Sequence, residues 1–148
     1  MKPELQYLKE NFKQSDEATN HLVSSLNRCK DFIFNETFTE EQLVELEALT
    51  SRFARVSDLL IQKILKTIDE IEGTTPGTVR DRLLQAEKKS IIINADDFME
   101  IRKIRNRIAH EYETDALRDI FVFAFNNSAL LIDSIKTAKE YSQKFYTE

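Results

Sequence analysis

Apolar residues recur at spacings of three and four along almost the whole chain, and no sustained alternation of apolar and polar residues appears. This spacing is that of one face of an α-helix, whereas alternation would indicate a strand. The pattern therefore predicts an all-α fold. With 148 residues but only two Gly and two Pro, the chain fits one domain, residues 1–148, in which long helices are joined by few turns.

Five helical stretches are expected, arranged as an up-and-down helical bundle. Their starts are marked by residues that can cap a helix, and a Thr39–Gln42 pair forms a capping-box pattern. The stretches are residues 4–34, with a candidate interruption near Ser15 and Asp16; from the Thr39 cap to Gly73; from the Thr78 cap to about Lys89; from the Asn94 cap through Ala95 to about Glu113; and from Thr114 or Asp115 to Phe145.

Two of these helices have unusual features: the length of the second suggests a distortion, and the apolar surface of the last suggests packing against more than one neighbour. The second, at about 33 residues and about 1.5 Å per residue, would be a rod of about 50 Å, so we expect it to bend or project. The last is apolar nearly all round from Phe121 to Phe125. Such a helix needs packing on more than one side, which we interpret first as core and second as a dimer face.

The charge and composition of the chain restrict its expected location in the cell and the partners that it can bind. The net charge of −5 and the pI of about 5.2 mean that any nucleic-acid site must be a local basic patch on an acidic protein. The start of the chain has no apolar signal region, and the longest apolar run, residues 120–125, is too short to span a membrane. We therefore expect a cytoplasmic protein without membrane attachment, in which the one cysteine, Cys29, is a buried thiol.

The segment around residues 98–112 combines an apolar face with a polar one. On a helical wheel the apolar arc holds Phe98, Ile101, Ile104, Ile108 and Tyr112. The polar arc spans about 140° and holds, in angular order, Arg105, Ala109, Arg102, Asn106 and His110. Asn106 and His110, four residues apart, would stack, and the small Ala109 would leave room for a ligand between Arg105 and His110.

An arginine beside a histidine suits phosphodiester cleavage. Imidazole moves protons near neutral pH, and guanidinium stays charged and offers a planar fork for phosphate oxygens. In RNA the 2′-hydroxyl attacks its own phosphorus, so the protein need only transfer protons and stabilise charge. The sequence has no metal-ligand spacing such as HExxH, and we expect neither a metal nor a cofactor. The alternative is an ordinary solvated helix face, which such residue pairs often form.

The residues Arg105-Asn106-Arg107-Ile108-Ala109-His110-Glu111-Tyr112 resemble the Arg-x4-His-x-Tyr signature of HepT-like toxins, a branch of the HEPN proteins. The expected helix order, with the motif ending the penultimate helix, is also similar to HEPN. The resemblance implies a metal-independent ribonuclease with His110 as acid or base, Arg105 holding phosphate, and Asn106 positioning the substrate or the imidazole. Arg102 would extend the substrate-binding surface.

The resemblance also implies partners. HEPN proteins pair as homodimers that bring two motifs to one cleft, which would concentrate positive charge on an acidic molecule. In HepT-like toxins the residue matching Tyr112 is modified with AMP by a minimal nucleotidyltransferase antitoxin, and a bulky anion there would repel RNA. An ordinary core tyrosine is the alternative for Tyr112.

Two other functions stay open from the sequence. Relatives of similar shape are non-catalytic, substrate-binding subunits of a minimal nucleotidyltransferase, and a purely structural bundle would use neither His110 nor Tyr112. Of the remaining charges, Arg52, Arg55 and Asp58 could line the same cleft from the second helix. Lys103 and Arg107 fit a solvated face better than a phosphate track.

Overall fold

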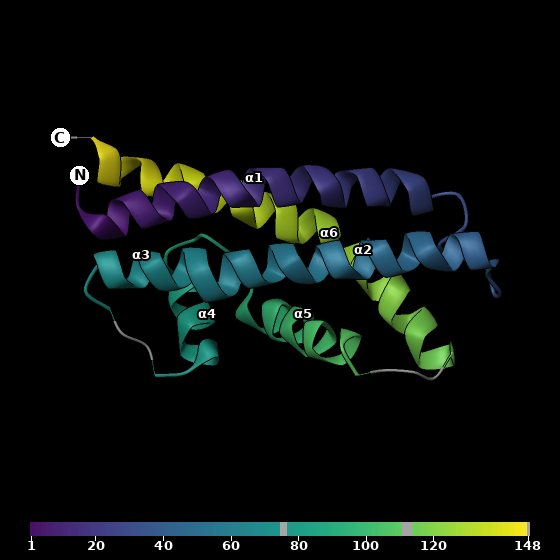
Figure 1. Cartoon of the computed structure of the whole chain (residues 1–148). Helices are drawn as coiled ribbons and strands as arrows, with labels where there is room; N and C mark the ends of the chain where they lie inside the picture. The colour runs from purple at the N-terminus through teal and green to yellow at the C-terminus, as the bar shows by residue number, and fades with distance from the viewer. Residues whose placement is uncertain (75–76, 111–113, 148) are drawn as a thin grey trace.

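The computed structural model describes residues 1–74, 77–110 and 114–147, and in these ranges all regular structure is helical. Counting α2, η1 and α3 as one continuous rod, five helices pack together, which confirms the all-α bundle (Figure 1). The elements are α1 Pro3–Cys29, α2 Glu40–Asp58, the π-helical segment η1 Leu59–Ile64, α3 Leu65–Ile71, α4 Val79–Lys88, α5 Ala95–Ile108, α6 Thr114–Ser142 and the 3₁₀ turn η2 Gln143–Tyr146.

Three of the predicted capping residues, Thr39, Thr78 and Asn94, begin their helices as expected. The Thr39 hydroxyl accepts from the Gln42 N–H at 3.1 Å, and the Gln42 side chain accepts from the Thr39 N–H at 3.0 Å. Thr78 accepts from the backbone of Asp81, and Asn94 caps α5. The long rod ends where Gly73 takes a φ of 75°, a left-handed conformation that glycine adopts without steric cost.

The first helix differs from the sequence prediction in two respects. The first helix is uninterrupted through Ser15 and Asp16, because Ser15 is buried and its hydroxyl donates to the Phe12 carbonyl at 2.8 Å. It ends at Cys29 rather than residue 34, and turns occupy residues 30–34. The rod is continuous, as predicted, and its distortion is the π-helical turn η1.

Helix α1 and the α2–η1–α3 rod run side by side, α4 and α5 lie on the other side of the rod, and α6 crosses behind the rod from the side of α5 to the side of α1 (Figure 1). The hydrophobic core contains buried residues from all of these helices. Aromatic side chains of α6 make edge-to-face contacts with three earlier segments, as the pairs Phe38–Phe121, Phe53–Phe123 and Phe34–Phe125. These contacts confirm that residues 121–125 pack as core on several sides. Cys29 is also buried, as predicted.

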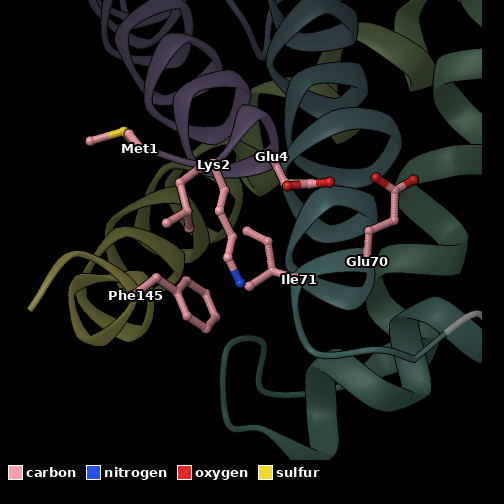
Figure 2. A pocket seen from close by; sticks show the side chains of 7 residues that line it. Met1, Lys2, Glu4, Glu70, Ile71 and Phe145 are labelled. Atoms are coloured by element: carbon pink, nitrogen blue, oxygen red, sulfur yellow. The ribbon is translucent and has the colours of Figure 1, made fainter. Parts of the chain in front are cut away.

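Both termini lie at the same end of the bundle (Figure 1). Tyr146 donates its hydroxyl hydrogen to the Leu5 carbonyl at 2.7 Å, which ties η2 to the start of α1. Figure 2 shows the hollow at this end, where the Lys2 side chain reaches toward Ile71 and Phe145. No described helix is long and apolar enough to cross a membrane.

Candidate functional site

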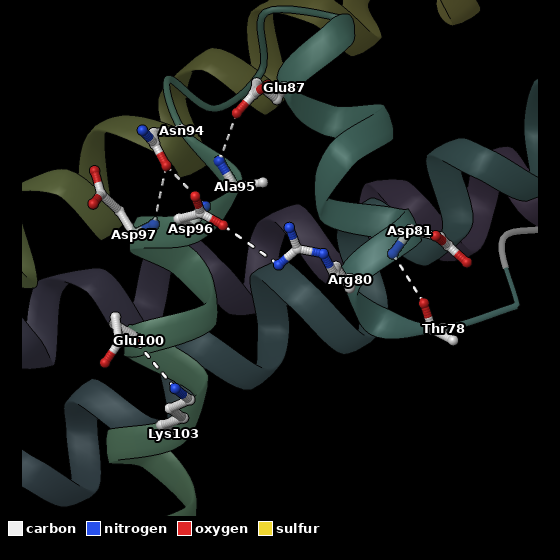
Figure 3. A network of polar contacts seen from close by, with 10 residues as sticks. All are labelled: Thr78, Arg80, Asp81, Glu87, Asn94, Ala95, Asp96, Asp97, Glu100 and Lys103. Atoms are coloured by element: carbon white, nitrogen blue, oxygen red, sulfur yellow. Dashed lines mark hydrogen bonds and ion pairs between the residues drawn. The ribbon is translucent and has the colours of Figure 1, made fainter.

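Helix α5 carries the predicted site and is anchored at its N-terminal end to α4. The Asn94 side chain accepts from the backbone N–H groups of Asp96 and Asp97, and the Glu87 carboxylate of α4 accepts from the Ala95 N–H at 2.8 Å (Figure 3). These bonds satisfy backbone donors that every helix start leaves unpaired. The start of α5 is therefore fixed against α4.

The apolar face of α5 is the one that the helical wheel predicts. Phe98 and Ile101 are fully buried, Ile104 is buried and Ile108 is half-buried. The opposite face, which carries Arg102, Arg105 and Asn106, therefore borders both the surface of the rod and the solvent. The wheel thus places the polar residues of α5 correctly.

Arg105 is held in a two-point ion pair with Asp58 of α2. Arg105 Nε lies 2.8 Å from Asp58 Oδ1, and Nη2 lies 2.9 Å from Oδ2. The hydrogen bonds that Arg105 donates to Asp58, with the charge of that carboxylate, raise the pKa of Arg105 above its ordinary value despite partial burial. A guanidinium has five N–H donors, so this pair leaves three for a further ligand. One edge of Arg105 is fixed and the other remains available.

Arg105 lies where two surface hollows adjoin. The first, which we call the Arg55 hollow, is about 610 Å³, and the second, the Arg102 hollow, is about 530 Å³. The Arg55 hollow is lined by Gln14, Ser51, Ala54, Arg55, Asp58, Leu59, Lys63, Arg105 and Ile108. The Arg102 hollow is lined by Ser57, Asp58, Ile61, Gln62, Lys63, Arg102, Arg105 and Asn106. Asp58, Lys63 and Arg105 belong to both, so the hollows form one continuous surface.

The π-helical turn explains why Asp58 and Lys63 share both hollows. In an α-helix, residues five apart point about 140° away from each other, since each residue turns by about 100°. Residues 59–64 instead form the wider turn, and the Leu65 N–H donates to the Leu60 carbonyl, five residues back. The wider turn brings positions five apart toward one side of the rod. π-helical turns are frequent at functional sites.

The two hollows together carry a positive charge on a protein whose net charge is −5. Their lining contains four cations, Arg55, Lys63, Arg102 and Arg105, against one anion, Asp58, which gives +3. Within the described ranges, the side chains of Arg55, Lys63 and Arg102 form no ion pair or hydrogen bond. These three cations are therefore available to a polyanion.

The predicted site residues are brought together in part. Arg102, Arg105 and Asn106 line the Arg102 hollow together. His110 is exposed and lines neither cationic hollow, and its imidazole has no hydrogen-bond partner among the residues that the structure describes. Tyr112 lies outside the described residues. Arginine and asparagine thus share one surface, with the histidine in the turn that follows their helix.

The prediction that the α5 helix continues to about Glu113 is wrong. The helix ends at Ile108, and the His110 N–H donates to the Arg107 carbonyl, three residues back, at 3.0 Å. The expected stacking of Asn106 on His110 assumed four-residue spacing through residue 110, which this tighter turn does not keep. No Gly or Pro marks the end of the helix.

Of the three α2 residues suggested for the cleft, two lie there and one does not. Arg55 and Asp58 line the Arg55 hollow. Arg52 instead faces α1, where its Nη1 donates to Ser25 Oγ at 2.8 Å and to the His21 carbonyl at 3.1 Å. The Arg52 side chain therefore connects α2 to α1, and the prediction that it lines the cleft is wrong.

Lys63 and Gln14 are site residues that the sequence did not single out. The sequence does contain a signal for the π-helical turn that places Lys63. The apolar stripe takes three successive four-residue steps, from Val56 through Leu60 and Ile64 to Ile68. Such a run exceeds the 3.6-residue period of an α-helix and indicates a wider turn. No comparable signal marks Gln14, which reaches the hollow only through the packing of α1 on the rod.

Within the described ranges, no three His, Cys, Asp or Glu side chains are grouped as metal ligands would be. The positive charge of the two hollows around Arg105 suits phosphate groups. Comparisons of the chain with protein-family models, with curated proteins and with solved structures find no match.

Proposed function

We propose that the protein is a metal-independent endoribonuclease toxin of the HEPN type, which cleaves RNA by attack of a 2′-hydroxyl on the adjacent phosphate. The observation that carries this proposal is the cationic surface around Arg105, whose guanidinium is fixed on one edge by Asp58 and open on the other. The Arg-x4-His-x-Tyr pattern places His110 five residues after that arginine.

In the proposed reaction the oxygen of the 2′-hydroxyl forms a bond to phosphorus and the bond to the 5′-oxygen breaks. One imidazole accepts the 2′-hydroxyl proton, and another group donates a proton to the departing 5′-oxygen. Arg105 and Arg102 stabilise the negative charge that develops on the phosphate oxygens. The products are a 2′,3′-cyclic phosphate and a 5′-hydroxyl, so neither water nor a metal is consumed in this step.

The proposal includes a homodimer and an antitoxin. A second copy of the chain would supply a second His110 as the proton donor and would double the cationic surface. A minimal nucleotidyltransferase partner would add AMP to Tyr112. This modification would place a negative charge within two residues of His110 and exclude RNA by repulsion.

The test is RNA cleavage by the purified full-length chain in EDTA, with detection of the cyclic phosphate end. His110→Ala and Arg105→Ala are expected to lower the cleavage rate by at least about 100-fold. The chain offers matched controls: His21, its only other histidine, is exposed on α1, and Lys103 is an exposed cation of α5 outside both hollows. His21→Ala and Lys103→Ala should cleave normally. Equal cleavage by His110→Ala and the wild type would refute the proposal.

One observation favours a second candidate, a non-catalytic nucleotide-binding subunit of a minimal nucleotidyltransferase. His110 lines neither of the two hollows that contain Arg105, so phosphate could be held there without being cut. Under this alternative the protein binds nucleotide or the nucleotidyltransferase, never degrades RNA in any condition, and retains this binding in His110→Ala.

A further inference from the structure

A third hollow adjoins the cationic surface and differs from it in chemistry. This Phe38 pocket, of about 620 Å³, lies among the segment before α2, α2 itself, the end of α5 and the start of α6. Its apolar walls are Phe38, Leu43, Ile108, Leu117 and Phe121. The two phenylalanine rings meet edge to face with centroids 6.1 Å apart, so part of the pocket lining is aromatic.

The Phe38 pocket and the Arg55 hollow share two lining residues, Ser51 and Ile108. Ile108 is the last residue of α5, three positions after Arg105, and His110 follows in the next turn. Within the described part of the motif, Ile108 thus forms part of the wall between a cationic hollow and an apolar pocket. A nucleotide has the same two parts, a charged phosphate and a flat, largely apolar base.

The charges of the two hollows are opposite. Whereas the cationic surface has a formal charge of +3, the described rim of the Phe38 pocket carries three carboxylates, Glu36, Glu47 and Asp115, and one cation, Arg118, which gives −2. Arg118 is also engaged, since its Nε donates to the Asn35 carbonyl at 3.1 Å. A phosphate is therefore repelled from this pocket, whereas a neutral group that presents N–H donors is attracted.

We propose that the Phe38 pocket binds a nucleobase of the RNA strand whose phosphate occupies the Arg55 hollow, and that it selects a base with an exocyclic amino group. This inference rests on the proposed function, because the strand is taken to be RNA. Adenine, cytosine and guanine each present an amino group to a carboxylate acceptor, as Glu and Asp do when they read cytosine N4. Uracil has no amino group, and two carbonyl oxygens flank its one N3–H donor, so it is disfavoured beside carboxylates. Aromatic and aliphatic walls supply contact that any base can use.

The experiment measures equilibrium binding of fluorescently labelled hexaribonucleotides rA6, rC6 and rU6 to the full-length His110→Ala protein, which leaves the RNA intact under the proposed function. We expect rA6 and rC6 to bind at least about tenfold more tightly than rU6, the effect of one hydrogen bond to a charged acceptor. Glu47→Gln in the same background should reduce this preference to less than about twofold. Asp115→Asn is a second variant of the rim and should likewise reduce the preference for rA6 and rC6 over rU6.

Glu41→Gln is the matched control, because Glu41 is exposed on the same helix as Glu47 and does not line the pocket. Equal binding of the three hexamers, a preference that survives in both rim variants, or no binding of any hexamer would overturn the inference. Failure of the nuclease proposal gives a different result: the wild type does not cleave RNA, while the preference for amino bases and its loss in Glu47→Gln remain. Cleavage by the wild type with equal binding of all hexamers rejects the pocket alone.

Discussion

Asp58 and Arg105 lie 47 residues apart in the sequence and meet edge to edge, with Nε–Oδ1 and Nη2–Oδ2 distances of 2.8 and 2.9 Å. The pair joins α2 to α5 at the edge where the two cationic hollows meet. Asp58 is the one anion among their lining residues. It therefore orients the arginine and also reduces the positive charge that a phosphate would meet.

Asp58→Asn is expected to separate these two effects. Loss of the carboxylate raises the charge of the hollows by one and strengthens RNA binding, while Arg105 loses its orientation and turnover falls by about tenfold or more. Single-turnover cleavage as a function of protein concentration should show a lower half-saturation point and a lower maximal rate. Asp133→Asn, at an exposed position of α6, should change neither quantity, and a variant of Asp58 with unaltered kinetics would contradict the role assigned to it.

Arg82 braces the π-helical turn from α4. Its Nη1 donates to the Ile61 carbonyl at 3.1 Å and to Gln62 Oε1 at 3.3 Å. Arg82→Met keeps most of the side-chain length and removes these bonds, which should lower the free energy of unfolding by about 1–2 kcal/mol in urea titrations. Arg80→Met on the same helix removes only an exposed 3.4 Å contact with Asp96 and should cost less than about 0.5 kcal/mol. Equal losses in the two variants would speak against the brace.

Glu72 belongs to a polar cluster that joins the end of the rod to α4 and α6. Lys89 Nζ lies 2.8 Å from Glu72 Oε1 and 2.9 Å from Asp69 Oδ1, and the Tyr141 hydroxyl donates to Glu72. Burial acts to raise the pKa of Glu72, but the hydrogen bonds from Lys89 and Tyr141 outweigh it, so that the pKa is lowered. For Lys89, burial is likewise outweighed by its two carboxylates, and the pKa is raised.

The lowered pKa of Glu72 fixes the direction of the pH dependence. The carboxylate stabilises the fold above its unfolded-state pKa, and this contribution is lost as the pH falls through the lower folded-state value. The stability difference between wild type and Glu72→Gln should therefore be largest near neutrality and shrink by about pH 3, measured by urea unfolding. Glu70→Gln, an exposed neighbour on α3, is the control and should follow the wild type throughout.

The Cys29 thiol is expected to be unreactive in the folded protein. Burial, followed by the charge of Glu45, raises its pKa to about 11, so at pH 8 the thiol is protonated as well as covered. A chromogenic disulfide reagent should react at least about 100-fold more slowly with the native chain than with the chain in urea, because reaction requires opening of the structure. Asn27→Cys in a Cys29→Ser background, at an exposed position of α1, should react at once. Rapid reaction of native Cys29 would show that the end of α1 opens readily.

Local signals in the sequence were sufficient for the number of helices and for three of their starts, but not for all of their ends. The caps at Thr39, Thr78 and Asn94 and the apolar face of α5 follow from side-chain hydrogen bonding and helical period alone. The end of α5 at Ile108 could not be foreseen, because no Gly or Pro follows it in the sequence. The partner of Arg105 could not be identified either, because the register between α2 and α5 depends on how the whole bundle packs.

The extra width of the helix at residues 59–64 links the site to the core. The same turn that brings Asp58 and Lys63 toward one side of the rod also sets the angle at which Ile64, Leu65 and Ile68 enter the core, where all three are buried. Removing one residue from this turn would rotate everything after it by about 100°. Selection for stability alone would therefore remove insertions and deletions in this turn. The spacing between Asp58 and Lys63 is then preserved even without selection for ligand binding.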